Sequence, residues 1–265
     1  MQVMKRLPLL LALCLLTACT AEPKEASSIS SASSASSLDS ARDDTGVSSA
    51  SSLSSTSSIS SLASSSSVSS PNPTPTPTPY TLRLSVPFSP QAPFAQWDAL
   101  HEEACEEMSL LLVHHFLDGT DLSREQAETE LLALMQWEEE HGYPQDVTVQ
   151  ELGEIAEKYF GYQSRIIENP MGEDLKRLLA DGHPVIVPAA GRDLKNPFFS
   201  GDGPWYHMLV LTGYNEFFFI TNDVGTKRGE GYVYRFGTLM NAIHDWTGIK
   251  ENIRQGTRRA LIIEK

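Results

Sequence analysis

A serine-rich stretch near the N-terminus limits which part of this chain can fold. Between residues 27 and 70, 25 of 44 residues are serine, mostly in Ser-Ser-Xaa units. Such a composition cannot bury enough apolar surface to offset the entropy lost on ordering. The alternating prolines of residues 71–79 then predict a stiff, extended polyproline II spacer. We therefore expect residues 19–79 to form a disordered stalk and residues 80–265 to form a single folded domain.

The first 18 residues have the features of a bacterial lipoprotein signal peptide. Lys5 and Arg6 precede an apolar run that is about half the roughly 20 residues a membrane-crossing helix requires. Leu16-Thr17-Ala18-Cys19 then matches the lipobox, in which the cysteine becomes the lipidated N-terminus. We therefore predict that Cys19 anchors the chain to the extracytoplasmic face of a cell membrane. The alternative is an ordinary signal peptide that releases a soluble secreted protein.

The acidic charge of the chain argues against two kinds of partner. From residue 71 onward, 16 Lys and Arg residues stand against 29 Asp and Glu residues, a net charge of −13. A surface of this sign repels nucleic acid and anionic lipid headgroups. We expect a monomer that binds no nucleic acid and contacts the membrane only through its lipid anchor.

The hydrophobic patterns of the domain predict helices first and strands later, which is typical of an α+β domain. Apolar residues at helical spacing indicate helices at 104–117, 123–140 and 148–160, and Thr148 with Glu151 forms a capping box. A hairpin is predicted to turn at Asn215-Glu216. Two further helices are predicted at 173–180 and 239–246, and strands at 82–88, 163–167, 185–188, 205–214, 217–221, 231–236 and 260–263.

Cys105 is the single thiol of the domain, because Cys14 leaves with the signal peptide and Cys19 is predicted to be lipidated. A disulfide within the domain and a site that needs several thiolates are therefore excluded. Cys105 opens a predicted helix, where the helix dipole and unpaired backbone N–H groups favour a thiolate. A buried, inert cysteine is the alternative. Four glutamates oppose the thiolate unless their side chains point away: Glu102, Glu103, Glu106 and Glu107.

A cysteine nucleophile requires a general base, and the predicted hairpin offers one. His207 begins the first strand and Asp223 ends the second, so the two residues are expected near the same end of the hairpin. An imidazole held by a carboxylate can act as a general base toward Cys105. The alternative is a half-buried strand histidine beside a turn-forming Asn222-Asp223.

Five segments of the domain, taken together, resemble one known family. They are Val86-Pro87-Phe88 with Gln91-Ala92-Pro93-Phe94, Glu103-Ala104-Cys105-Glu106-Glu107, Pro184-Val185-Ile186-Val187-Pro188, Tyr206-His207-Met208-Leu209-Val210 and Ile220-Thr221-Asn222-Asp223. The family is that of the papain-like cysteine peptidases related to bacteriocin-processing (double-glycine) peptidases. The resemblance covers nearly all of residues 80–265 and implies a papain-like fold, with helices packed on a mainly antiparallel sheet.

Carried over by position, the resemblance assigns a role to each matching residue. Cys105 would be the nucleophile, His207 the general base and then acid, and Asp223 the orienting carboxylate. Gln91 would donate its side-chain amide to the oxyanion hole, beside the backbone N–H of Cys105. The sequence departs from the family where Glu106-Glu107 replace a small Gly-Pro or Gly-rich step, and where Val224 replaces a proline.

No metal ion or organic cofactor is expected. His101, His114 and His115 lie near one another in the sequence, but adjacent histidines point to different helix faces and no cysteine is near them.

The sequence therefore predicts a membrane-tethered thiol hydrolase that cleaves peptide or isopeptide bonds in a peptide or protein substrate. Two alternatives from other classes stay open. The first alternative is a non-catalytic papain-like binding lipoprotein. The second is a thiol amidase or transglutaminase-like acyl transferase with the same three residues.

Overall fold

The computed structural model describes residues 78–265, so the predicted signal peptide, Cys19 and residues 19–77 of the predicted stalk lie outside the described residues. None of the described helices is long and apolar enough to cross a membrane. The helices are η1 (His101–Glu103), α1 (Cys105–Asp118), α2 (Arg124–His141), α3 (Val149–Ile155), which continues as η2 (Ala156–Phe160), α4 (Gly172–Ala180), η3 (Gly191–Leu194), α5 (Phe236–Ala242) and η4 (Lys250–Gln255). The strands are β1 (Leu82–Arg83), β2 (Gln163–Glu168), β3 (Val185–Ala190), β4 (Tyr206–Tyr214), β5 (Phe218–Asn222), β6 (Tyr232–Arg235) and β7 (Arg259–Glu264).

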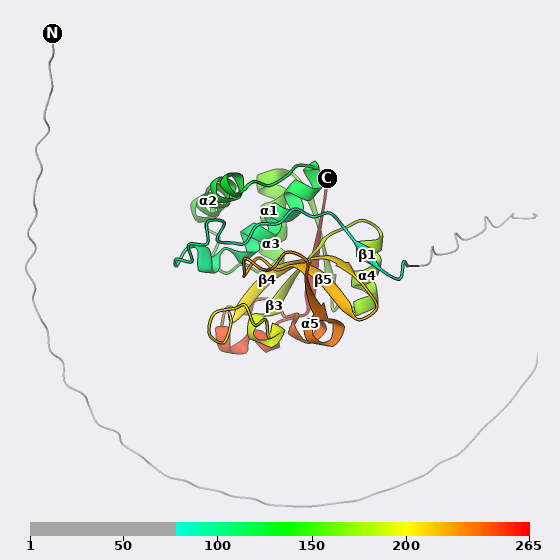
Figure 1. The fold of residues 1–265 in the computed structure, drawn as a ribbon. Coiled ribbons are helices and arrows are strands. Elements are labelled where there is room, and N and C mark those ends of the chain that lie inside the picture. Colours follow the sequence, from blue (N-terminus) through cyan, green and yellow to red (C-terminus); the bar gives the residue numbers. More distant parts are fainter. Residues whose placement is uncertain (1–77) are drawn as a thin grey trace, which may run out of the picture. The chain divides into compact units, whose positions relative to one another are not determined.

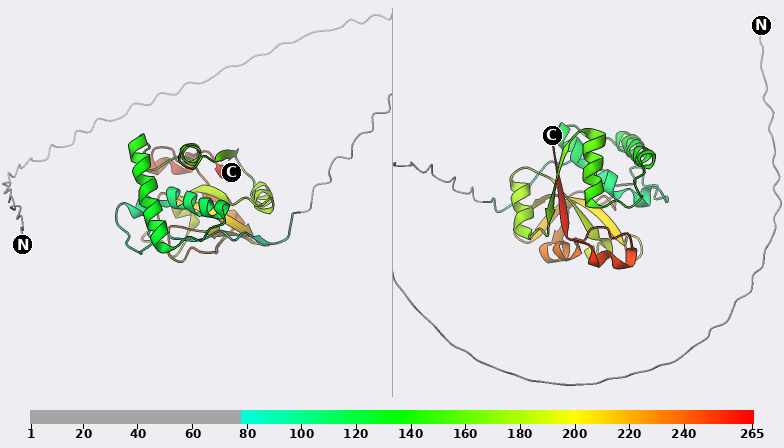
Figure 2. Two further views of the ribbon diagram at one scale, coloured as in Figure 1. Left: turned by 90° about the horizontal axis from the view of Figure 1, so that it is seen from above. Right: turned by 180° about the vertical axis from the view of Figure 1, so that it is seen from behind.

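Within residues 78–265 the strands form one antiparallel sheet in the order β2-β7-β3-β4-β5-β6, and β1 pairs with β4 outside this path. Figure 1 shows α1 and α2 on one side of the sheet and α5 on the other. The two turned views in Figure 2 show the same layers from above and from behind. The predicted α+β class, with helices packed on a mainly antiparallel sheet, is confirmed.

A hydrophobic core lies on each face of the sheet, because successive side chains of a strand point to opposite faces. Met208 and Val210 of β4 pack with residues of α1, α2 and α3. Leu209 and Leu211 pack on the other face with residues of α4 and α5. All nine residues of β4 are buried as a result. The N-terminal end of α1, which carries Cys105, is thereby held against the strand that carries His207.

The helix ends follow the capping signals in the sequence. At α3, Thr148 Oγ1 accepts a hydrogen bond from the Glu151 N–H at 3.2 Å, and Glu151 Oε2 accepts one from the Thr148 N–H at 2.8 Å. Ser123 and Gln126 make the same reciprocal pair at α2. The predicted capping box at Thr148 is therefore confirmed.

Two predicted elements differ from the structure. The strand expected at 82–88 is reduced to β1 because the chain then leaves the sheet, and the carbonyls of Val86 and Pro87 bind the Asn222 side chain instead. The helix expected at 239–246 runs from Phe236 to Ala242. It ends there because Ile243 is extended and pairs with Ala189 of β3.

Candidate active site

His207 and Asp223 are in direct contact at one end of the β4–β5 hairpin. The His207 Nε2–H donates to Asp223 Oδ1 at 2.8 Å, and both side chains are buried. Since Nε2 holds the proton in this bond, the lone pair of the neutral ring is on Nδ1. Among the described residues, Nδ1 of His207 has no hydrogen-bond partner. That nitrogen is therefore available to accept a proton.

Asp223 is surrounded by hydrogen-bond donors. Besides His207, the Gly225 N–H donates to Oδ1 at 3.1 Å, and Asn196 Nδ2 donates to Oδ2 at 2.9 Å. The Tyr234 hydroxyl also donates to Oδ2. Burial alone would raise the pKa of Asp223, but His207, Tyr234 and Asn196 outweigh it and hold that pKa below its usual value. Asp223 is therefore a carboxylate that fixes the orientation of the imidazole.

A glycine leaves room for the imidazole. A Cβ atom at Gly225 would lie 2.8 Å from His207 Cε1 and 3.1 Å from His207 Nε2, too close for any other residue without a shift of the ring. Phe199 contacts the same ring edge-on, with ring centroids 5.3 Å apart. The position of the imidazole is thus set by neighbours on several sides.

Cys105 is the first residue of α1 and is 5% exposed. The Met208 N–H donates to its Sγ at 3.3 Å, which ties the thiol to the strand residue that follows His207. The thiol itself donates to Glu106 Oε2 at 2.9 Å. The backbone N–H of Cys105 has no acceptor among the described residues, as expected for the first turn of a helix.

The surroundings of Cys105 reverse one expectation from the sequence. Burial raises the pKa of the thiol well above its usual range, and the Glu106 carboxylate adds to this effect. The helix N-terminus was expected to favour the thiolate, whereas burial and the adjacent Glu106 act in the opposite direction. The resting thiol is therefore protonated.

Glu106 belongs to a group of three buried carboxyl groups between α1 and α2. One oxygen of each of Glu106, Glu107 and Glu138 has no hydrogen-bond partner among the described residues. Burial raises the pKa of Glu106 well above its usual range, that of Glu107 to about 7 and that of Glu138 to about 11. The three groups do not all carry a charge near neutral pH, because burial disfavours each charge and Glu107 also opposes the ionisation of Glu106 and Glu138.

Removing the carboxylate beside the thiol is expected to increase its reactivity. A charge on Glu106 opposes the loss of the proton from the Cys105 thiol. Glu106→Gln removes that charge and should therefore move the alkylation of Cys105 to lower pH. At a fixed mildly alkaline pH the rate with iodoacetamide should rise by about tenfold or more. The exposed Glu139→Gln on α2 is the control. An unchanged pH profile for Glu106→Gln would contradict this reading.

Gln91 lies at the start of α1, but its amide is already engaged. Its Nε2 donates to the carbonyls of His101 and Glu102 at 2.8 and 3.0 Å, and its Oε1 is buried without a partner. The Gln91 N–H donates to the Val224 carbonyl at 2.9 Å, which holds the loop against the end of β5. In this structure the side chain therefore supports the segment that leads into Cys105.

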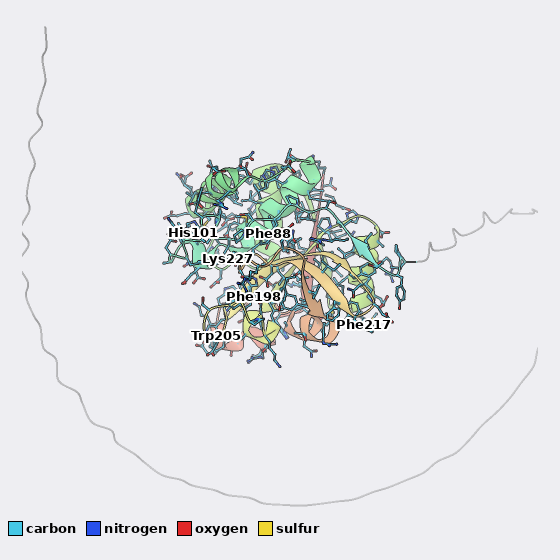
Figure 3. All side chains as sticks on the ribbon, viewed as in Figure 1. Phe88, His101, Phe198, Trp205, Phe217 and Lys227 are labelled. Carbon is cyan, nitrogen blue, oxygen red and sulfur yellow. The ribbon has the colours of Figure 1, made fainter. Side chains whose placement is uncertain are left out.

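A cavity of about 300 Å³ joins these residues, and its walls include Gln91, Cys105 and His207. Asp223 is not part of the wall and lies buried behind His207. In the view of Figure 3, His101 lies above Trp205 at the left of the domain. Trp205 lines the cavity, and so do Glu102 and Glu103, which follow His101 in the chain. The remaining lining residues are Trp97, Glu102, Glu103, Asp146, Phe199, Ser200, Gly203, Pro204, Trp205, Tyr206, Gly225 and Lys250.

Three neighbours of the candidate site were not found from the sequence. Asn196 and Tyr234 bind Asp223, and Phe199 contacts His207. Asn196 and Phe199 lie in an irregular loop, where no periodic pattern indicates which side chain points inward. Tyr234 is on β6, and its sequence context predicts only an aromatic residue in a strand, with no sign of a contact to Asp223.

One comparison with known proteins identifies a family. The model of the Peptidase_C39 like family matches residues 83–252, a range that contains Gln91, Cys105, His207 and Asp223. No curated protein matches the chain. Among solved structures, the chain is similar to a crystal structure from Bacillus anthracis assigned as a C39-like peptidase. The sequence identity is 14% and the TM-score 0.48, over 70% of this chain and 98% of that one.

Proposed function

Since the chain belongs to the Peptidase_C39 like family, we propose that it is a cysteine peptidase whose reaction uses Cys105, His207 and Asp223. One observation carries the proposal. The imidazole is held through Nε2 by a buried carboxylate, and its ring lines the same cavity as the only cysteine of the described residues. This is the pattern of a nucleophile, a base and an orienting group.

In the proposed reaction, His207 Nδ1 takes the proton of the Cys105 thiol as the sulfur attacks the carbonyl carbon of a peptide or isopeptide bond. The free N–H of Cys105 donates to the oxyanion that forms. His207 then gives its proton to the leaving amine, and a thioester remains on Cys105. A water molecule, deprotonated by His207, hydrolyses the thioester and restores the thiol.

The thiol must first leave Glu106 for this to occur, because its hydrogen bond is made to Oε2 of that residue. No hydrogen bond joins the Cys105 sulfur to His207 among the described residues. We infer that substrate binding turns the thiol toward Nδ1, since catalytic hydrogen bonds often tighten only in the complex.

The test is to incubate the full chain with a peptide mixture and to follow new amino termini, together with labelling by an electrophilic thiol probe. Cleavage with the label on Cys105 is expected. Transfer of the acyl group to an added amine, with no hydrolysis, would instead support the acyl transferase alternative. A chain that binds peptides but neither cleaves nor becomes labelled would support the binding-protein alternative.

Gln91 remains the proposed second donor of the oxyanion hole, and one of its two N–H bonds to the 101 and 102 carbonyls would have to open for that role. Gln91→Ala should then lower turnover by roughly 10²-fold. Thiol labelling should be nearly unchanged, because labelling forms no oxyanion at that position. An equal loss of labelling and turnover would mean that Gln91 only supports the loop before Cys105.

We further propose that the domain is tethered to a membrane through a lipid on Cys19, with residues 20–79 as the stalk. Cys19→Ala should move the chain from the membrane to the soluble fraction. Activity per folded domain should be kept, because a flexible stalk separates anchor and domain. Fractionation measures the first and peptide cleavage the second. Firm membrane attachment of the Cys19→Ala chain would contradict the tether.

A further inference from the structure

A second polar cluster lies at the end of α1 opposite to Cys105. It consists of His114 and His115 of α1 and Glu130 of α2, and one ligand atom from each residue lies within 4.8 Å of the others. The two adjacent histidines were expected to point to different helix faces. Their ring centroids are instead 5.1 Å apart and the rings meet edge-on, so both can reach the same glutamate. His101 is not part of the cluster and binds Asp98 and Glu128.

The hydrogen bonds of His114 leave one of its nitrogens with a free lone pair. The Tyr162 hydroxyl donates its single proton to Asp118 Oδ1 at 2.9 Å, and the Lys265 ammonium 2.8 Å from the same oxygen keeps Asp118 ionised. The phenol oxygen must therefore accept the hydrogen bond of 2.7 Å from His114 Nδ1. In the neutral ring the lone pair is then on Nε2, which has no hydrogen-bond donor among the described residues.

His115 and Glu130 supply the other two ligands. Glu130 Oε2 lies 2.8 Å from His115 Nε2, and His115 Nδ1 is 2.8 Å from Thr120 Oγ1. Because a hydroxyl either donates or accepts, Thr120 fits both tautomers of the ring. The His115 side chain is 5% exposed, whereas the Glu130 side chain is 36% exposed. The carboxylate is therefore free to adjust while the imidazole is held in place.

We propose that His114, His115 and Glu130 bind a divalent transition-metal ion of the Zn²⁺ class. Two imidazoles and one carboxylate suit such an ion, with water at the open position. Ligand atoms of a tetrahedral zinc site are about 3.4 Å apart. The pairs that are farther apart therefore have to close by up to about 1.4 Å, and the pair His115 Nε2 and Glu130 Oε2, now 2.8 Å apart, has to open by about 0.6 Å. Asp118 acts through Tyr162 on His114 in the way that a carboxylate fixes a zinc-bound histidine.

Binding of the ion requires His115 to change its tautomer. The single proton of the neutral ring moves from Nε2 to Nδ1 by exchange with water, the Nε2 lone pair binds the metal, and the Thr120 hydroxyl turns to accept the hydrogen bond of Nδ1–H, so no net proton is released. No electron is transferred and no bond of the chain is broken. The bound ion would connect the end of α1 to the beginning of α2, apart from the proposed catalytic residues.

The experiment is titration of the full chain carrying Cys105→Ala with Zn²⁺ in a calorimeter, since that background removes the thiol as a competing ligand. Saturable binding of one ion per chain is expected. His114→Ala and Glu130→Gln should each weaken binding by at least about tenfold, and Tyr162→Phe by roughly 10- to 100-fold. Ca²⁺ should not compete, because it prefers oxygen ligands.

His183→Ala is the matched control, because His183 also faces a glutamate, Glu264 at 3.5 Å, but has no third ligand within residues 78–265. Binding by this variant should equal that of the parent chain. Glutamine has nearly the same shape as glutamate, and Glu130 is partly exposed, so Glu130→Gln should unfold at the same temperature as the parent chain in the absence of metal. If it does, its loss of Zn²⁺ binding is due to the missing ligand and not to unfolding. No saturable Zn²⁺ binding by the parent, or unchanged binding by both His114→Ala and Glu130→Gln, would overturn the proposal.

Discussion

Replacing Cys105 by alanine is expected to lower peptidase turnover by at least about 10⁴-fold while the domain stays folded. The substitution removes the only sulfur atom of the described residues and with it any thioester intermediate. The methyl group of alanine fits the same buried position at the start of α1. The Met208 N–H loses its sulfur acceptor, a modest loss beside the effect on chemistry. Initial rates on a cleaved peptide and the thermal unfolding midpoint measure the two effects.

The conservative control is Cys105→Ser, which keeps a donor toward Glu106 but supplies a far weaker nucleophile. Both variants should still bind the peptide. If Cys105→Ala kept more than about a hundredth of the wild-type turnover, Cys105 would not be the nucleophile, and the catalytic proposal would have to be abandoned.

The second large effect is expected for Asp223→Asn, which should lower turnover by about 10⁴-fold. All four hydrogen bonds to Asp223 are made by donors, two at Oδ1 and two at Oδ2. An asparagine can accept on only one side and turns its NH₂ group toward donors on the other. If the NH₂ group faces His207, the ring takes the opposite tautomer and Nδ1 becomes protonated. If it faces Asn196 and Tyr234, buried donors oppose each other.

Tyr234→Phe provides the comparison for Asp223→Asn. It removes one donor to Oδ2 and leaves the bond between His207 and Asp223 in place. Its turnover should fall much less than that of Asp223→Asn, although both variants should unfold at lower temperature than the wild type. Equal turnover for Asp223→Asn and wild type would show that the carboxylate has no part in orienting the base.

The hairpin of His207 and Asp223 could be predicted from the sequence because it is local. Two short apolar strands separated by a turn fix which residues lie at the same end, and the pairing of Val210 with Asn222 places His207 and Asp223 there. The distant partner, Cys105, could be singled out because it is the single thiol of the domain, and the family resemblance then assigned it the role of nucleophile. No local pattern connects it to a residue about a hundred positions further along.

What could not be predicted depends on side-chain packing. The helix dipole at Cys105 favoured a thiolate, yet the sign of the pKa shift is set by burial and by the rotamer of Glu106, neither of which the sequence specifies. The donors Asn196 and Tyr234 meet Asp223 only after a loop and a neighbouring strand fold over it. The divergence of His114 and His115 was expected from an ideal helix, whereas in the structure their ring centroids are 5.1 Å apart, with His114 bonded to Tyr162 and His115 to Glu130.

The hydrogen bond from Cys105 to Glu106 also affects how long the protein survives in air. Oxidants attack the thiolate, and a thiolate that reacts is carried toward sulfenic and then irreversible sulfinic acid. Burial, and after it the adjacent Glu106, raises the pKa of this 5% exposed thiol, so Cys105 presents little of the vulnerable thiolate. Without a second cysteine among the described residues, no disulfide within the domain could rescue an oxidised sulfur. Burial of the thiol, together with the glutamate to which it is bonded at rest, therefore protects the nucleophile from oxidation until a substrate arrives.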